Sequence, residues 1–333
     1  MNVKSLFEGF RNKKVLVIGD VMLDRYMIGN VNRISPEAPV PIIELSREED
    51  RLGGAANVAL NVYSLGAEVH LAAVVGQDEA GKKIIELCSQ SGIGSGAIVS
   101  LSTRPTTVKT RILGNKQQLL RVDSEVITDL NAEEEKVVQD QLLNFIKEDF
   151  DAIIFEDYNK GMLTEKIIQS VIQKAKSHNI ITTVDPKKKN FFSYTGVTLF
   201  KPNLKELKEG VGVTIDFPHD KNGFEKAIEI LHQRISNTFT FITLSEHGVA
   251  ISDHTKVDYF NAHLRNISDV SGAGDTVIAV ATLCLASGCS MQELAQISNL
   301  AGGLVCEKSG VVSIESKELM KEVEKLFASN RVS

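Results

Sequence analysis

Residues 152–186, AIIFEDYNKGMLTEKIIQSVIQKAKSHNIITTVDP, decide the fold class. Residues 152–157 and 180–186 are short and apolar with many β-branched side chains, as buried strands are. Between them, residues 165–177 repeat apolar side chains at helical spacing. Two strands joined by a helix of this length lie parallel in one sheet, with the helix packed on a face of that sheet.

The same alternation of strand and helix patterns extends along most of the chain. Further strand patterns begin at Val15, Val69, Thr198 and Phe239. Further helical patterns cover residues 55–65, 80–91, 132–147 and 223–235. The order predicts an α/β fold with a doubly wound, mostly parallel sheet and helices on both of its faces. We expect one domain that spans residues 1–333.

Polar side chains follow several of these strands. They are Asp20, Asp157, Asp185, Asn203 and Ser245. The carboxyl ends of parallel strands meet at one edge of a sheet, and ligands of such sheets bind there. This edge is therefore where we expect the functional site.

Two segments, residues 26–46 and 106–122, interrupt the strand-helix alternation. Both alternate apolar with polar residues, and Gly114-Asn115 in the second suits the turn of a β-hairpin. We expect them to form a small β-sheet lid. A small sheet with one apolar face needs a cover, so the lid should fold over the site or pack against a second copy, which predicts a homodimer through the lid.

Composition excludes some classes of function. The chain of 333 residues has 37 Lys and Arg against 43 Asp and Glu, a net charge of −6, which argues against general binding to nucleic acid or to a membrane surface. Its longest apolar stretch, around residues 277–286, is far shorter than the ~20 residues that cross a bilayer, and the N-terminus lacks an apolar signal segment. Four cysteines without metal-ligand spacing indicate reduced thiols in a cytoplasmic protein.

The strongest local signal for chemistry is residues 269–275, DVSGAGD, followed by an apolar helical run. Small residues let backbone amides approach an anion, and the helix that follows directs its free N–H groups at the same place. The motif predicts a phosphate site with the carboxylate of Asp275 inside it. Alone, Asp275 could also be an acidic residue that stabilises the first turn of the helix.

Three further motifs admit a functional and a structural interpretation. Asn203 and Glu206 could hold a hydrated magnesium ion near phosphates, but their spacing is also that of a helix capping box. Residues 53–57, GGAAN, could let a ligand or a neighbouring backbone come close. Residues 76–83, GQDEAGKK, nearly match a P-loop but lack its hydroxyl ligand for magnesium and place two acidic residues in the cradle, so we expect a strand-to-helix turn.

In combination, seven motifs in this order resemble the ribokinase-like sugar kinases, the PfkB carbohydrate kinase family. They are GDVMLD, GGAAN, VVGQDEAG, VDPK, KPNLKE, TLSEHG and DVSGAGDT. Within that family, the segments DRYMIGNVNRISPEAPVP, KTRILGNKQQLLRVD and EDYNKG resemble the kinases that phosphorylate O1 of D-glycero-D-manno-heptose 7-phosphate. The resemblance covers nearly the whole chain.

The resemblance implies ATP-dependent phosphorylation of a sugar hydroxyl. Asp275 would take the proton from that hydroxyl, and backbone amides would stabilise charge on the transferred group. The amides are those of Gly272, Ala273 and Gly274. On the sugar side, the matching positions are Asp24 and Asn57.

On the nucleotide side, the resemblance implies that Asn203 and Glu206 organise Mg²⁺ and the ATP phosphates, with Glu206 reaching the metal through water. Four further residues match the nucleotide-binding loop and the adenine pocket. They are Thr243, Ser245, Gly248 and Asn299. Asp269 and Ser271 lie where many members of the family bind a monovalent cation such as K⁺, although Ser271 stands where Thr is more usual.

A substrate that already carries a phosphate needs cations far from the reacting hydroxyl. The candidates are Arg33, Lys109, Arg111 and Arg121 on the lid segments, with Lys160 and Lys187 near strand ends. Cations on lid strands could equally serve solubility. Asp157 and Asp185, at the ends of their strands, are expected to face the same cleft. Glu156 stands where Ser is expected in the heptose kinases, which puts the geometry around Asp157 in question.

Three alternatives remain open. The chain could act on a different sugar or sugar phosphate, it could be a binding regulator that has lost the chemistry, or it could be a dinucleotide-dependent dehydrogenase. The last lacks the glycine fingerprint after the first strand. The heptose kinase also occurs fused to a nucleotidyltransferase with a His-x-Gly-His signature, and since no histidine here heads such a motif, we expect a standalone kinase. Its 1,7-bisphosphate would lead to ADP-heptose for lipopolysaccharide or a surface glycan.

Overall fold

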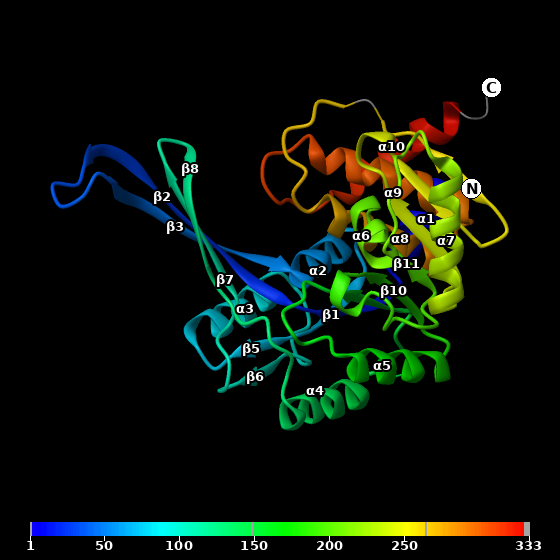
Figure 1. Cartoon of the computed structure of the whole chain (residues 1–333), viewed down its shortest axis with the longest axis horizontal. Helices are drawn as coiled ribbons and strands as arrows, with labels where there is room; N and C mark the ends of the chain where they lie inside the picture. Colours follow the sequence, from blue (N-terminus) through cyan, green and yellow to red (C-terminus); the bar gives the residue numbers. More distant parts are fainter. Residues whose placement is uncertain (1, 148, 264, 330–333) are drawn as a thin grey trace.

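The computed structural model describes residues 2–147, 149–263 and 265–329. A sheet of eight strands forms the centre of the molecule, and a separate sheet of four strands projects from it on one side (Figure 1). A third sheet has two strands, β5 (Val74–Gly76) and β6 (Val99–Leu101).

The central sheet has the strand order β14-β13-β12-β11-β10-β9-β1-β4. Its parallel strands are β1 (Lys14–Gly19), β4 (Glu68–Ala72), β9 (Ala152–Glu156), β10 (Ile181–Asp185), β11 (Leu199–Phe200) and β12 (Phe239–Thr243). Two antiparallel strands complete one edge, β13 (Val249–Ser252) and β14 (Val257–Phe260). The predicted doubly wound, mostly parallel sheet is therefore confirmed.

Helices cover both faces of this sheet. Successive side chains of a strand point to opposite sides, so a strand that is apolar throughout presents apolar side chains to both faces. In β1, Val15 and Val17 belong to one hydrophobic cluster, whereas Leu16 and Ile18 belong to the other. The first cluster contains side chains of α1 (Val3–Phe10), α2 (Ala55–Ser64), α3 (Glu79–Gln90), α8 (Ala273–Ala286), α9 (Met291–Cys306) and α10 (Ser316–Ser329). The second contains side chains of α4 (Ala132–Phe145), α5 (Glu165–Ser177), α6 (Leu204–Val211) and α7 (Lys221–Ile235). Among the described residues, no helix combines the length and the hydropathy needed to span a bilayer.

The projecting sheet, called the lid sheet below, has the strand order β3-β2-β7-β8. Its strands are β2 (Val21–Ile34), β3 (Pro41–Gly54), β7 (Val108–Gly114) and β8 (Gln117–Ser124). Both predicted lid segments lie in this sheet. The first is longer than predicted, since β2 begins before residue 26 and β3 ends after residue 46. The hairpin turn falls at Asn115 and Lys116, one residue later than predicted, because these two residues take the positive φ values of 51° and 69°.

The segment that resembles a P-loop is a strand-to-helix turn, as predicted. Asp78 caps α3 by accepting the backbone N–H of Gly81 at 2.8 Å. The same carboxylate accepts both the backbone N–H and the hydroxyl of Thr106, at 2.8 and 2.7 Å. Asp78 therefore fastens the start of α3 to the chain that leads into the lid sheet.

Replacement of Asp78 by Ala should lower the free energy of unfolding by about 2 kcal/mol, because it removes a helix cap and leaves the amides and hydroxyl that it bound without their acceptor. Chemical denaturation measures the change. Glu79→Ala is the matched control: Glu79 is the exposed neighbour, its ion pair with Lys82 is on the surface, and its loss should cost less than about 0.5 kcal/mol. Equal losses in both variants would contradict the structural role of Asp78.

Candidate active site

The start of α8 supplies the central element of the site. Gly272, the residue before the helix, has φ of 80°, which favours glycine. A side chain at Gly272 would come within 3.1 Å of the Asn57 amide, and one at Gly274 would face the Asp185 carboxylate at 3.6 Å. Glycine at these positions leaves the free N–H groups of the helix open to an anion.

Asp275 lies in the first turn of α8 and is 7% exposed. Its Oδ2 accepts a hydrogen bond from Asn57 Nδ2 at 2.6 Å, and its Oδ1 accepts one from the Tyr158 hydroxyl at 3.1 Å. Burial raises the pKa of Asp275 to about 6, against the opposing effect of these hydrogen bonds. A carboxylate with this pKa is ionised at neutral pH and is still basic enough to take a proton.

A chain of opposite charges lies beside Asp275, at the carboxyl edge of the central sheet. Asp185 contacts Lys201 at 2.7 Å and Lys187 at 3.4 Å, and Lys187 also pairs with Glu206. Burial works against ionisation of Asp185, but the two ammonium groups outweigh it and lower its pKa. Likewise, Asp185 and Glu206 raise the pKa of Lys187 in spite of its burial. The two lysines therefore remain cationic in this cluster.

Glu156, at the end of β9, is a buried acid of the same edge. It is 1% exposed, and its Oε2 has no hydrogen-bond partner among the described residues. Burial, followed by repulsion from Asp185 and Asp275, raises its pKa well above the usual value. Burial and the neighbouring carboxylates therefore disfavour the charged form of Glu156.

Asn203 and Glu206 form a capping box at the start of α6. Asn203 Oδ1 accepts the Glu206 N–H, and Glu206 Oε2 accepts the Asn203 N–H, both at 2.8 Å. The structural interpretation of this pair is thus confirmed, while Oε1 of Glu206 faces Lys187. In the described part of the chain, no three Asp, Glu, His or Cys side chains are grouped as metal ligands.

The residues expected on the nucleotide side lie at the ends of β12 and on α9. Thr243 pairs with Asn203 through an isolated bridge, which joins two neighbouring strand ends. Ser245 and Gly248 have φ of 54° and 86° in the turn after β12, and a side chain at Gly248 would collide with the carbonyl of Phe260. Asn299 donates to the Asn261 carbonyl at 2.8 Å and so connects α9 with the segment after β14.

The base of the lid sheet contributes the residues expected on the sugar side. Asp24 is buried and pairs with Arg111 at 2.5 Å. Asp24 and Asn57 both line a cavity of about 230 Å³. Lys109 is half-buried, and burial, together with the nearby charge of Lys160, lowers its pKa. No described carboxylate forms an ion pair with Lys109.

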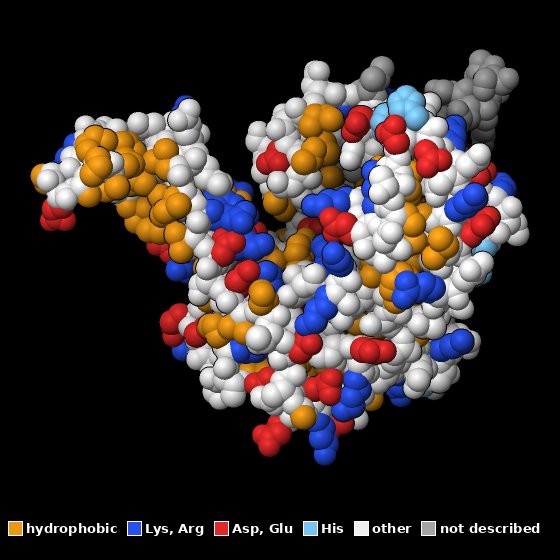
Figure 2. Space-filling view, viewed as in Figure 1, with side chains coloured by type: hydrophobic (Ala, Val, Ile, Leu, Met, Phe, Trp, Pro, Cys, Tyr) orange, Lys and Arg blue, Asp and Glu red, His pale blue; other side chains and the backbone are white. Residues whose placement is uncertain are grey.

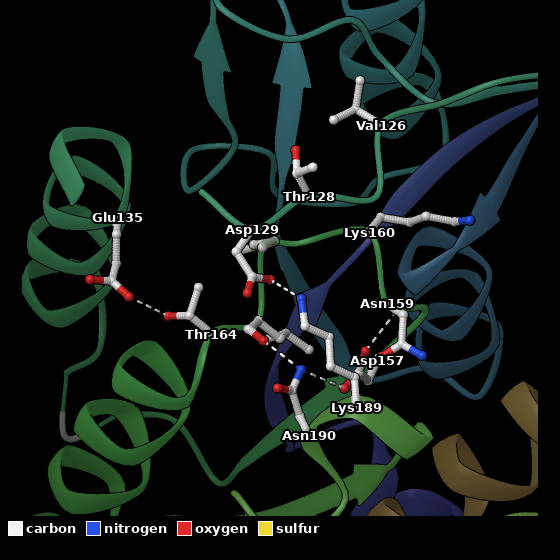
Figure 3. A network of polar contacts seen from close by, with 12 residues as sticks. Val126, Thr128, Asp129, Glu135, Asp157, Asn159, Lys160, Thr164, Lys189 and Asn190 are labelled. Carbon is white, nitrogen blue, oxygen red and sulfur yellow. Dashed lines mark hydrogen bonds and ion pairs between the residues drawn. The ribbon is translucent and has the colours of Figure 1, made fainter. Parts of the chain in front are cut away.

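Of the remaining expected substrate ligands, three lie apart from this cluster, and Lys160 lies near Lys109. Asp157 is fully buried, and its carboxylate accepts from Asn159 N and Asn190 Nδ2 (Figure 3). It also accepts from the Tyr194 hydroxyl. Its carboxyl group therefore points into the protein and not into the cleft beside Asp185. The others are Arg33 and Arg121, both exposed on the lid sheet, and Lys160, which pairs with Glu125 at 2.7 Å.

Asp269 and Ser271, the expected ligands of a monovalent cation, form a tight turn before α8. Asp269 Oδ1 accepts the Ser271 N–H at 2.9 Å, and its Oδ2 accepts the Gly310 N–H at 3.1 Å. These hydrogen bonds, Ser271 first, lower the pKa of Asp269 and keep it ionised.

Reasoning from the sequence missed three residues of the site. Tyr158 and Lys201 lie inside the motifs EDYNKG and KPNLKE, in which the predicted site residues are Asp157, Lys160, Asn203 and Glu206. Asp20 was noted only as a strand end, but it accepts the backbone N–H groups of Tyr158 and Lys160 at 3.0 and 2.9 Å. Burial raises its pKa to about 6. The signal in the sequence that could have identified these three residues is their position just after strands β1, β9 and β11.

Comparison with known proteins agrees with this geometry. Residues 12–318 match the model of the pfkB family carbohydrate kinases. The chain is 40% identical over 310 residues to the bifunctional protein HldE of Methylobacillus flagellatus, covering 93% of this chain and 63% of that protein. It is 39% identical to the bifunctional protein HldE of Helicobacter pylori strain J99, covering 92% and 65%. The chain thus spans slightly less than two thirds of these relatives.

Solved structures show the same fold. Phosphofructokinase-2 from Escherichia coli in complex with potassium superposes with a TM-score of 0.76 at 18% identity, over 94% of this chain and 99% of that one. The same enzyme in complex with fructose-6-phosphate gives a TM-score of 0.74 at 18% identity, over 95% and 99%. With the match over residues 12–318, the chain belongs to the pfkB family of carbohydrate kinases and is an ATP-dependent sugar kinase.

Proposed function

We propose that this kinase transfers the γ-phosphoryl group of ATP to O1 of D-glycero-D-manno-heptose 7-phosphate. The product is the 1,7-bisphosphate, an intermediate towards ADP-heptose for lipopolysaccharide or a surface glycan. One observation carries the proposal: Lys109, a half-buried cation without a carboxylate partner among the described residues, lies at the base of the lid sheet, 6.0 Å from the ring of Tyr158, whose hydroxyl binds Asp275. A second phosphate on the acceptor would give this ammonium group a direct anionic partner, which the more distant carboxylates of Asp24, Asp123 and Glu125 do not provide.

Asp275 accepts the proton of the anomeric hydroxyl as that oxygen attacks the γ-phosphorus, and ADP leaves. The free N–H groups around Gly272, Ala273 and Gly274 stabilise the charge on the transferred phosphoryl group. Asp24 and Asn57 hold sugar hydroxyls on the other side. The phosphate at the far end of the sugar is held by Lys109, with Arg111 and Lys160 nearby.

The nucleotide lies over α6 and the turn after β12. Asn203 and Glu206 organise its phosphates. The other residues that contact the nucleotide are Thr243, Ser245, Gly248 and Asn299. Bound Mg²⁺ neutralises phosphate charge, and because the described residues offer no cage of carboxylates, nucleotide phosphates and water would be its ligands, with Glu206 reaching it through water. Asp269 and Ser271 would hold a monovalent cation, K⁺ being our choice. Lys187, which lies beside Asp185, binds the phosphates. Since ATP and reduced thiols are cytoplasmic, we place the enzyme in the cytoplasm.

The lid sheet should join two copies into a homodimer. It exposes large apolar side chains, which gather over its outer part (Figure 2). They include Ile34, Val40, Leu45, Leu119, Leu120 and Val122, each between 43% and 60% exposed. Arg33 lies nine residues beyond Asp24 on β2, about 30 Å of strand, so it could approach a cleft only in such a pair.

An assay of ADP formation with Mg²⁺ and a panel of acceptors tests the substrate. The panel is heptose 7-phosphate, fructose 6-phosphate, fructose 1-phosphate, ribose and fructose. Strong preference for heptose 7-phosphate supports the proposal. Preference for another sugar would keep the kinase and replace the acceptor.

Asp275→Asn should lower kcat by about 100-fold or more, because the amide cannot take the proton, while ATP binding stays nearly unchanged. Steady-state kinetics and nucleotide titration measure the two effects. Turnover close to that of the wild type would rule out Asp275 as the base.

Lys109→Ala should raise KM for heptose 7-phosphate by about 10-fold or more, with a change of less than about 3-fold in KM for ATP, because a hydrogen bond to a charged group is lost. The matched control is Lys116→Asn, at the exposed hairpin tip of the same sheet, which should change neither constant. Parallel changes in both constants for Lys109→Ala would mean that the residue acts on lid closure or folding.

Leu120→Lys combined with Val122→Lys should convert a dimer into a monomer, because it places charge on the apolar face of the lid sheet. Light scattering coupled to size exclusion gives the mass. Val137→Lys, at an exposed apolar site on α4, is the control and should leave the dimer intact. A monomeric wild-type protein would contradict the dimer.

A further inference from the structure

Tyr158 is held in place from both its backbone and its side chain. The loop between β9 and α5 that carries it is fixed by Asp20, which accepts the N–H groups of Tyr158 and Lys160 at 3.0 and 2.9 Å. Arg104 binds the carbonyl of Lys160 at 2.7 Å and that of Thr128 at 3.2 Å. Because the loop is fastened on both sides, the position of the tyrosine hydroxyl is set by the fold.

The hydroxyl of Tyr158 donates to Oδ1 of Asp275, while Asn57 donates to Oδ2. Both oxygens of the carboxylate are thus held, which fixes the plane of the group and leaves a lone pair on each oxygen for a substrate hydroxyl. Burial, and then the negative charge of Asp275, raises the pKa of Tyr158 well above its usual value. The phenol therefore stays protonated and remains a donor.

The ring of Tyr158 lies near cations of two different parts of the molecule. Lys109, on strand β7 of the lid sheet, has its Nζ 6.0 Å from the ring centroid, and Lys187, after β10, has its Nζ 5.8 Å away. At these distances an ammonium group is attracted by the face of an aromatic ring. One side chain thus contacts the base and lies near both the lid cation and the cation at the sheet edge.

We propose that Tyr158 is a positioning residue of the phosphoryl transfer, which orients the Asp275 carboxylate through its hydroxyl and places the Lys109 ammonium through its ring. The inference rests on the proposed role of Asp275 as the base. In the reaction the proton of the sugar hydroxyl goes to Asp275, the phosphoryl group goes to the sugar oxygen, and ADP leaves. Tyr158 donates its hydrogen bond before and after this step and changes neither its charge nor its proton.

The groups that face Asp275 come from four neighbouring elements. They are Asn57 of α2, Glu156 and Tyr158 at and after β9, Asp185 at the end of β10 and Lys201 after β11. Asp185 raises the pKa of Asp275, whereas Asn57, Tyr158 and Lys201 lower it. Loss of the tyrosine hydroxyl should therefore raise that pKa, and since the base must be ionised, activity should be lost at a higher pH on the acid side.

Tyr158→Phe tests the hydroxyl. We expect kcat to fall by about 10-fold, KM for ATP to stay within about 2-fold, and the acid limb of the kcat profile to move from about pH 6 to higher pH. Tyr259→Phe is the matched control, since it removes the hydrogen bond between Tyr259 and Glu225 at 2.9 Å and should leave the limb in place. An unmoved limb with unchanged kcat in Tyr158→Phe would overturn the inference.

The double variant Asp275→Asn with Tyr158→Phe separates positioning from general structural damage. If Tyr158 acts through Asp275, the second substitution should lower kcat by less than about 2-fold in the Asp275→Asn background. A further 10-fold loss would show that Tyr158 acts elsewhere and would contradict the inference.

A titration without substrate keeps the test independent of the acceptor. The carboxyl ¹³C resonance of Asp275, assigned by its absence in Asp275→Asn, should titrate near pH 6 in the wild type and at higher pH in Tyr158→Phe. Unchanged titration would overturn the hydrogen bond even if the enzyme is active. Conversely, a shifted titration together with wild-type turnover in Asp275→Asn would refute the proposed base and keep the contact.

Discussion

The ion pair between Asp185 and Lys201 lies almost wholly out of water at the carboxyl edge of the central sheet, with 2.7 Å between its charged atoms. Removing two charges from water is costly unless each finds partners, so neighbouring groups must compensate. Lys187 supplies a second cation to Asp185, and Glu206 completes the chain of alternating charge. Gly274, in the first turn of α8, faces this pair.

This arrangement leaves Asp275 and Glu156 as carboxyl groups with raised pKa values beside a fixed ion pair. The two acids differ in their hydrogen bonds and in their proposed roles. Asp275 is held at both oxygens and titrates near pH 6, which suits a group that takes up a proton during turnover. Glu156 is buried, and its surroundings disfavour its charged form.

The sequence was sufficient to predict the fold, because helical and strand periods are local properties. The range 165–177 was predicted for α5 and is observed at the same residues. Asp275 could also be predicted from the sequence, since its motif combines glycines with the start of a helix. The contact between Tyr158 and Asp275 was not, because 117 residues separate the two side chains and only the sheet order brings them together. The position of Asp157 after a strand did not reveal where its side chain points. Adjacent residues of a strand point to opposite faces of the sheet, and Asp157 lies on the face that packs against α5.

Phosphorus NMR of the product tests the central claim most directly, since it shows which hydroxyl of which sugar receives the phosphoryl group. With ATP, Mg²⁺ and heptose 7-phosphate, we expect a second phosphate signal coupled to the anomeric proton, with the 7-phosphate signal retained. A product phosphorylated at any other position, or no new signal while another acceptor is consumed, would contradict it.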